Sequence, residues 1–90
     1  MATEVHSPTL RVRIRAFARI RELLDASEVM LDVDPGSRVR DVVAALARAT
    51  PSLQSLLPAT RVARNGRIGS DDERVEDGDE LALLPPVGGG

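Results

Sequence analysis

Polar and apolar side chains alternate strictly along residues 10–17, LRVRIRAF, and this alternation limits the folds that the chain can adopt. Successive side chains of a β-strand point to opposite faces, so Val12 and Ile14 share one face and the arginines between them share the other. A strand with one apolar and one polar face belongs to a sheet that is covered on one side. The chain must therefore supply a second layer for the apolar face.

One long amphipathic helix is available for that layer. Residues 38–49 carry apolar side chains at helical spacing, and Pro51 forces the chain out of the helix. Ser37 is predicted to cap the start of this helix. A shorter helix is expected over residues 18–25, where apolar residues recur at the same spacing.

Further strands are predicted on both sides of the main helix. Residues 27–34 and 80–84 alternate as residues 10–17 do, and Asn65-Gly66 is a strong signal for a two-residue hairpin. The order is strand, short helix, strand, helix, hairpin and strand. This order predicts an α+β domain of the β-grasp (ubiquitin-like) class, with a mixed sheet packed on one main helix.

The chain of 90 residues is long enough for one small domain with short segments at its ends. Residues 1–8 lack periodicity and are expected to form a flexible leader. Residues 9–84 are predicted to form the β-grasp domain. Residues 85–90 are predicted to form an extended C-terminal Pro-Pro-Val-Gly-Gly-Gly tail.

The composition argues against several kinds of site and partner. The chain has no cysteine and one histidine, so neither a disulfide nor a metal site is expected. A net charge of −2 argues against nucleic-acid binding, and no stretch is apolar enough for a membrane span or a signal peptide. All 12 basic residues are arginines, so no side chain can accept an acyl group as an amide. We expect a cytoplasmic domain without a bound cofactor.

The arginines of the first strand have a structural interpretation. If the first two strands pair antiparallel, their outward residues carry opposite charges, which stabilises a strand pair by about 0.2–1 kcal/mol per contact. The expected partners are Arg11, Arg13 and Arg15 on one strand and Glu28, Asp32 and Asp34 on the other. This interpretation is favoured over a phosphate site.

Two apolar residues fall on the outward phase of their strands. Phe17 is the only aromatic residue, and Leu84 is the last residue of the final predicted strand. The first and last strands of a β-grasp sheet are neighbours, so Phe17 and Leu84 can form an exposed patch for a partner. The alternative is that Phe17 lies beyond the end of its strand and folds under the first helix.

The tail has the chemistry of a carboxylate that another protein must reach. Two prolines favour an extended backbone without internal hydrogen bonds, and glycines carry no Cβ. Such a thread can enter a narrow channel, and a final glycine leaves its carboxyl carbon open on both faces. We therefore interpret the C-terminal segment as the functional part of the chain.

The sequence resembles the small, sulfur-carrying subunit of molybdopterin synthase. The resemblance is carried by FARIRELL at residues 17–24, EDGDELALLPPV at residues 76–87 and Gly-Gly at residues 89–90. It departs from the family pattern where Leu83 and Leu84 replace a common Phe-Phe pair. Arg64 also stands where an apolar residue commonly precedes the hairpin Asn.

This resemblance implies a sulfur-transfer cycle. An E1-like adenylating enzyme would use ATP to adenylate the carboxylate of Gly90, next to Gly89, and a persulfide sulfur donor would convert the adenylate into a thiocarboxylate. The tail would then enter the large catalytic subunit of molybdopterin synthase, in a heterotetramer, and give sulfur to cyclic pyranopterin monophosphate during molybdenum cofactor biosynthesis. The chain would be a non-catalytic subunit, because it has no nucleophile and base pair of its own.

The resemblance also assigns contact roles. Residues Pro85, Pro86, Val87 and Gly88 would dock the tail. The apolar residues Phe17, Ile68 and Leu84 would contact both the activating enzyme and the acceptor.

Three alternatives remain open at the level of the sequence. The first is a sulfur carrier for another pathway, such as cysteine, thiamine or tRNA thiolation. The second is a ubiquitin-like protein modifier whose Gly90 forms an amide with a lysine of a target. The third is a plain interaction domain, in which case removing Gly89 and Gly90 would change no function.

Overall fold

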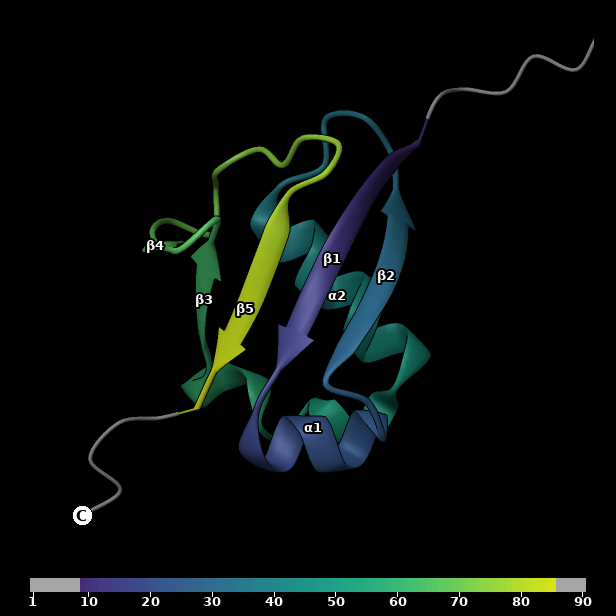
Figure 1. Ribbon diagram of the computed structural model, residues 1–90, viewed down its shortest axis with the longest axis vertical. Coiled ribbons are helices and arrows are strands. Elements are labelled where there is room, and N and C mark those ends of the chain that lie inside the picture. Colours follow the sequence, from purple (N-terminus) through teal and green to yellow (C-terminus); the bar gives the residue numbers. More distant parts are fainter. Residues whose placement is uncertain (1–8, 86–90) are drawn as a thin grey trace, which may run out of the picture.

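A mixed β-sheet covered on one face by a helix forms the body of the protein (Figure 1). The computed structural model describes residues 9–85. The elements are β1 (Leu10–Ala16), α1 (Ala18–Leu24), β2 (Glu28–Val33), α2 (Val39–Ala49), the 3-10 turns η1 (Pro51–Leu53) and η2 (Leu57–Ala59), β3 (Arg61–Arg64), β4 (Arg67–Ile68) and β5 (Glu80–Leu84).

The strands of the described part lie in the order β2-β1-β5-β3-β4. β1 and β5, the first and last strands, are parallel neighbours at the centre, while β2 and β3 flank them antiparallel. α2 crosses behind this sheet in Figure 1. The arrangement confirms the predicted α+β class and the β-grasp (ubiquitin-like) fold, with a mixed sheet packed on one main helix.

The core lies between α2 and the inward face of the sheet. Val42 and Leu46 of α2 are buried together with Val12, Ile14 and Leu83 of the central strands. Their burial follows from the two periodicities of the sequence, because the apolar stripe of the helix faces the apolar phase of the strands. Hydrophobic burial between these two layers is the main source of stability.

The start of α2 differs from the prediction. The residue at the N-cap is Arg38, not Ser37, and no side chain at that position caps the helix. Instead, the carboxylate of Asp41 accepts a hydrogen bond from the Arg38 backbone N–H at 2.9 Å. An acidic side chain in the first turn thus satisfies a free amide and also faces the positive end of the helix dipole.

The hairpin at Asn65-Gly66 is confirmed. Arg64 pairs with Arg67, so the loop between β3 and β4 has two residues, with φ values of 50° at Asn65 and 85° at Gly66. A turn with φ positive at both central positions suits the twist of the flanking strands, and Asn-Gly adopts it readily.

The arginines of β1 are paired with acids, but not with all the expected partners. Arg11 lies opposite Asp32, with 3.0 Å between Nε and Oδ1, and Arg15 lies opposite Glu28. Arg13 lies opposite Met30, because the register joins Leu10 to Val33 and so places Asp34 beyond the paired strand. The guanidinium of Arg13 instead lies 3.5 Å from Glu28 and 3.7 Å from Glu80.

A buried carboxylate ties the β3–β4 hairpin to the turn before β5. Asp79 is 6% exposed and accepts hydrogen bonds from Arg64 Nε at 2.7 Å, Asn65 Nδ2 at 2.9 Å and the Glu76 backbone N–H at 2.8 Å. Burial by itself raises the pKa of Asp79, but these hydrogen bonds and the charge of Arg64 hold its pKa below the ordinary value. The network fixes the edge of the sheet beside β5.

Replacing Asp79 by Ala is expected to lower the free energy of unfolding by about 2–4 kcal/mol, because it leaves the Arg64 charge and two further donors without their acceptor. Urea denaturation would measure the loss. Asp71→Ala, which removes an exposed carboxylate from the neighbouring loop, is the matched control and should change stability by less than about 0.5 kcal/mol.

The same network gives stability a defined dependence on pH. The folded pKa of Asp79 is lowered, so its contribution is complete above the unfolded value of about 3.8 and is lost as the pH falls through the folded pKa. Asp79→Asn should therefore flatten the loss of stability as the pH falls below about 4. An equal acid dependence in both proteins would contradict this role.

Candidate functional site

The outward face of the sheet carries a row of paired residues that is apolar on β5, β3 and β4 and ends at an arginine on β1. Arg15 of β1 pairs with Ala82 of β5, Ala82 pairs with Ala63 of β3, and Ala63 pairs with Ile68 of β4. Paired residues share a face, so these residues form one row on the face of the sheet that points away from α2. Ala63 and Ala82 make a low floor, and Ile68 stands at its edge with 58% of its surface exposed.

Leu84 and Phe17 extend this row toward the end of β5. Ala16 pairs with Leu83 in the parallel ladder, so Phe17 and Leu84 follow at the ends of adjacent strands. Both are half-buried, and the Arg15 guanidinium lies 5.6 Å from the centroid of the Phe17 ring. Phe17 lies beyond the end of β1, at the N-cap of α1. This is the position that the alternative interpretation gave it.

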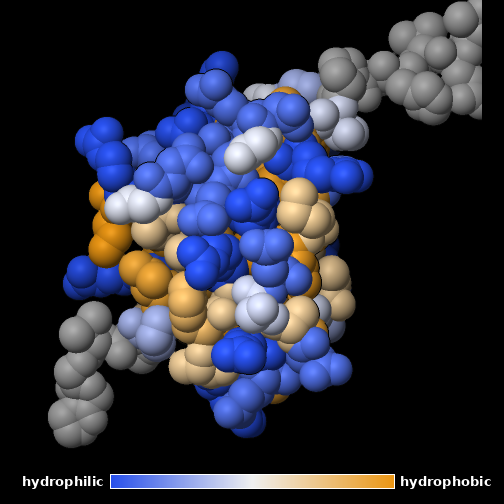
Figure 2. Space-filling model, in the orientation of Figure 1, coloured by the Kyte–Doolittle hydropathy of each residue, from blue (hydrophilic) through white to orange (hydrophobic). Residues whose placement is uncertain are grey.

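We call these five residues, Phe17, Ala63, Ile68, Ala82 and Leu84, the outer patch. Figure 2 shows hydrophobic surface on this face toward β3, β4 and the end of β5, hydrophilic surface over most of the rest, and a further hydrophobic area on the β2 side. On β2, Met30 lies opposite Arg13 and is 49% exposed. The three predicted contact residues do not form one tight cluster. Ile68 lies three strand spacings from β1, about 14 Å, and the two alanines join it to Leu84.

The outer patch leads directly to the point where the described chain ends. Pro85 follows Leu84 and is exposed. It lines an apolar cavity of about 290 Å³, together with Phe17, Ile20, Leu56 and Ala59. Predicted tail residues Pro86, Val87, Gly88, Gly89 and Gly90 lie outside the described residues.

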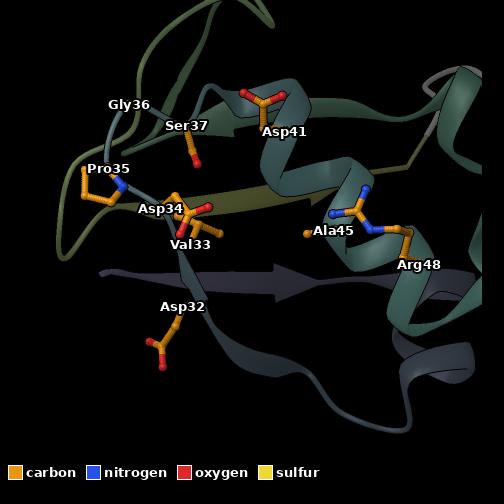
Figure 3. A pocket seen from close by; sticks show the side chains of 9 residues that line it. All are labelled: Asp32, Val33, Asp34, Pro35, Gly36, Ser37, Asp41, Ala45 and Arg48. Atoms are coloured by element: carbon orange, nitrogen blue, oxygen red, sulfur yellow. The ribbon is translucent and has the colours of Figure 1, made fainter. Parts of the chain in front are cut away.

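A second, polar pocket of about 430 Å³ lies between the end of β2 and α2 (Figure 3). Its carboxylates do not converge, because Asp32 points away from Asp41 and Arg48. Within residues 9–85, no group of three or more His, Asp or Glu side chains is placed to hold a metal ion. None of the helices in that range has the length and hydrophobicity needed to cross a membrane.

These features define the class of the protein: it is a ubiquitin-like β-grasp protein with an apolar surface next to the exit of its last strand. The same fold occurs in a ubiquitin from Caldiarchaeum subterraneum, which is 25% identical with a TM-score of 0.62 over 92% of this chain and all of that one. The model of the ThiS family matches residues 14–90. The chain belongs to the ThiS family.

Two relatives show the range of that family. Small archaeal modifier protein 1 from Haloferax volcanii is 38% identical over 84% of this chain and 97% of its own length. Its crystal structure has a TM-score of 0.82 over 87% of this chain and 99% of that chain. The molybdopterin synthase sulfur carrier subunit from Escherichia coli is 37% identical over 88% of this chain and 99% of its own length.

Sequence patterns missed three residues of this surface. Ala63 and Ala82 carry too little side chain to be singled out, and their importance comes from the register that joins Leu84 to Ile68. Arg61 lies opposite Leu84, which no local pattern reveals because β3 and β5 are distant in sequence. These residues can be identified only when it is known which residues pair across β3, β4 and β5.

Mutations should separate the outer patch from the core. Ile68→Ala is expected to change the free energy of unfolding by less than about 0.5 kcal/mol, because the side chain is 58% exposed. Leu83→Ala, on the inward phase of β5, should lower it by about 2–5 kcal/mol. Thermal or urea unfolding would measure both. A large loss for Ile68→Ala would mean that the residue supports the fold and is not held in place for a partner.

Proposed function

We propose that the protein is the sulfur-carrier small subunit of a molybdopterin synthase. The carboxylate of Gly90 is the group that carries sulfur, and the outer patch docks the domain on the proteins that activate and use it. The observation that carries this proposal is the match to the ThiS family, which runs through residue 90. Relatives from Escherichia coli and Chlamydomonas reinhardtii are molybdopterin synthase sulfur carrier subunits, and the second is matched over its whole length.

The proposed chemistry begins outside this chain. An E1-like enzyme binds ATP, and an oxygen of the Gly90 carboxylate attacks the α-phosphorus, forming an acyl-adenylate and releasing pyrophosphate. The terminal sulfur of a persulfide donor attacks the acyl carbon and releases AMP. A thiol then cleaves the sulfur–sulfur bond, which leaves the thiocarboxylate on Gly90 and a disulfide on the donor side.

The outer patch supplies binding energy for both encounters. Leu84 lies one residue before the tail begins, so a partner that covers Leu84 also holds the start of the tail. The tail then reaches an active site as part of a bound domain, not as a free peptide, which lowers the entropy lost on reaction. In the large synthase subunit, the thiocarboxylate would give its sulfur to cyclic pyranopterin monophosphate.

The sulfur-carrier reaction predicts a change in intact mass. After incubation with an E1-like enzyme, ATP and a persulfide donor, mass spectrometry should find an added mass of about 16 Da on Gly90, as expected for one oxygen replaced by sulfur. An alkylating agent should trap the product at that position alone, because the chain has no cysteine.

Deletion of Gly89 and Gly90 is the control for this assay. It should abolish the mass change without lowering the melting temperature, because the core lies in residues 12–83. Unaltered activity after the deletion would instead support a plain interaction domain.

Leu84→Glu should weaken binding to the activating enzyme and to the acceptor subunit together. A carboxylate at this half-buried position loses water when a partner covers it and is offset within the chain only by Arg61 opposite it, so a loss of about tenfold or more in each affinity is expected. Titration calorimetry with each partner would measure the loss, after a thermal melt has established that the variant folds. Loss of one partner alone would contradict a shared docking surface.

A role as a protein modifier is the second candidate, and the 38% identity to small archaeal modifier protein 1 favours it. In that role, Gly90 forms an amide with a lysine of a target protein. The chain itself has no lysine, so it cannot form polymers through its own side chains. Mass spectrometry of cellular proteins would detect Gly90 in amide linkage if this second activity exists.

A further inference from the structure

One arginine beside the outer patch lacks the partner that comparable arginines have. Arg61 pairs with Leu84 across the β3–β5 ladder and therefore shares the outward face with Leu84 and Ala63. Its side chain is exposed. Within residues 9–85, no carboxylate lies within 4 Å of its guanidinium.

The outward arginines of β1, and Arg64 on the other phase of β3, lie close to carboxylates. Arg11 lies 3.0 Å from Asp32, Arg13 lies 3.5 Å from Glu28, and Arg64 lies 2.7 Å from Asp79. Arg15, on the far side of the outer patch, has a weaker contact, because its guanidinium lies 4.0 Å from a Glu80 carboxylate that also contacts Arg13. Positive charge therefore remains on two sides of the apolar row, next to Leu84 and next to Ala82.

We propose that the E1-like enzyme that activates the tail presents a carboxylate to Arg61, at the border of an apolar surface that covers Leu84 and the two alanines, Ala63 and Ala82. The inference rests on the proposed function and names the chemistry of the partner's contact surface. Charge complementarity carries it, because a positively charged border disfavours a basic partner and attracts an acidic one. Arg15 offers a second, weaker contact to the same surface.

Arginine suits this position better than a group whose charge could be lost. Its guanidinium stays charged at any physiological pH and can hold a carboxylate through two parallel hydrogen bonds. Because Arg61 lies opposite Leu84, one residue before Pro85, such a bond would also orient the partner toward the tail. A charge at the border of an interface acts mainly on the association rate and on its salt dependence.

The test measures how well variants serve as substrates of the E1-like enzyme, by ATP–pyrophosphate exchange. For Arg61→Glu, the KM for the chain should rise on the order of tenfold at low ionic strength, with kcat unchanged. The ratio of the KM of Arg61→Glu to that of the wild-type chain should approach one in about 0.5 M salt, because screening weakens the repulsion. Arg61→Gln should fall between the wild-type chain and Arg61→Glu.

Two controls carry the same change in charge elsewhere. The first is Arg67→Glu. Arg67 belongs to the same β3–β4 hairpin, but it pairs with Arg64 and so faces the opposite side of the sheet from Ile68. Arg48→Glu lies on α2, on the covered side of the sheet (Figure 3). Both should keep a KM within about twofold of the wild-type chain, since neither borders the outer patch.

The outcomes separate the inference from the proposed function. If the wild-type chain supports no exchange, the proposed function fails and the inference fails with it. If the wild-type chain is adenylated but Arg61→Glu behaves like the two controls, the inference alone is overturned. A raised KM at low salt for Arg61→Glu only, with an unchanged melting temperature, supports an acidic partner surface at Arg61.

Discussion

The parallel pairing of β1 with β5 is the contact on which the rest of the structure depends. It joins segments from the two ends of the domain at the centre of the sheet, where Ile14 pairs with Leu81 and Ala16 with Leu83. These residues are buried against α2, so the pairing and the core stabilise each other. The same pairing places Phe17 and Leu84 at neighbouring strand ends, where the chain leaves the sheet. A surface for partners and the start of the tail therefore share one origin.

The outward face is divided between a charged half and an apolar half. On β1 and β2, arginines and acids neutralise each other through exposed contacts, each of which contributes little to stability. On β3, β4 and β5, the outward residues are small or apolar apart from Arg61 and Glu80, and the Asp79 network holds that edge in place. The division gives an incoming protein one apolar area with a defined border. Because the buried carboxylate of Asp79 supports this edge of the sheet, its exposed residues are not needed for stability and can serve recognition.

The sequence predicted much of this fold because its periodicities are strong. Alternation located β1 and β5, helical spacing located α2, and Asn65-Gly66 located the hairpin. Its failures concern contacts between distant segments and one local feature, the cap of α2. Asp34 was predicted to lie opposite the arginines but falls beyond the paired residues of β2, because alternation gives the face of a strand but not its register. Ser37 is a good capping residue, yet the helix begins one residue later because Asp41 satisfies the Arg38 amide. Leu84 and Ile68 were predicted as contact residues, whereas Ala63, which connects them, has no local signal.

Local patterns in the chain are enough to specify which residues face the core, which segment covers the sheet, and that a glycine-rich segment follows the last strand. These properties depend on side-chain polarity at short spacing, so nearby residues suffice to specify them. The tertiary structure alone decided that Ala63 and Ala82 join Leu84 to Ile68, that Asp79 anchors the hairpin, and that Arg61 stands beside Leu84 without an acidic neighbour in residues 9–85. Each of these depends on the register between strands that are far apart in the chain. That register is set when the whole apolar face packs at once, and no single segment contains it.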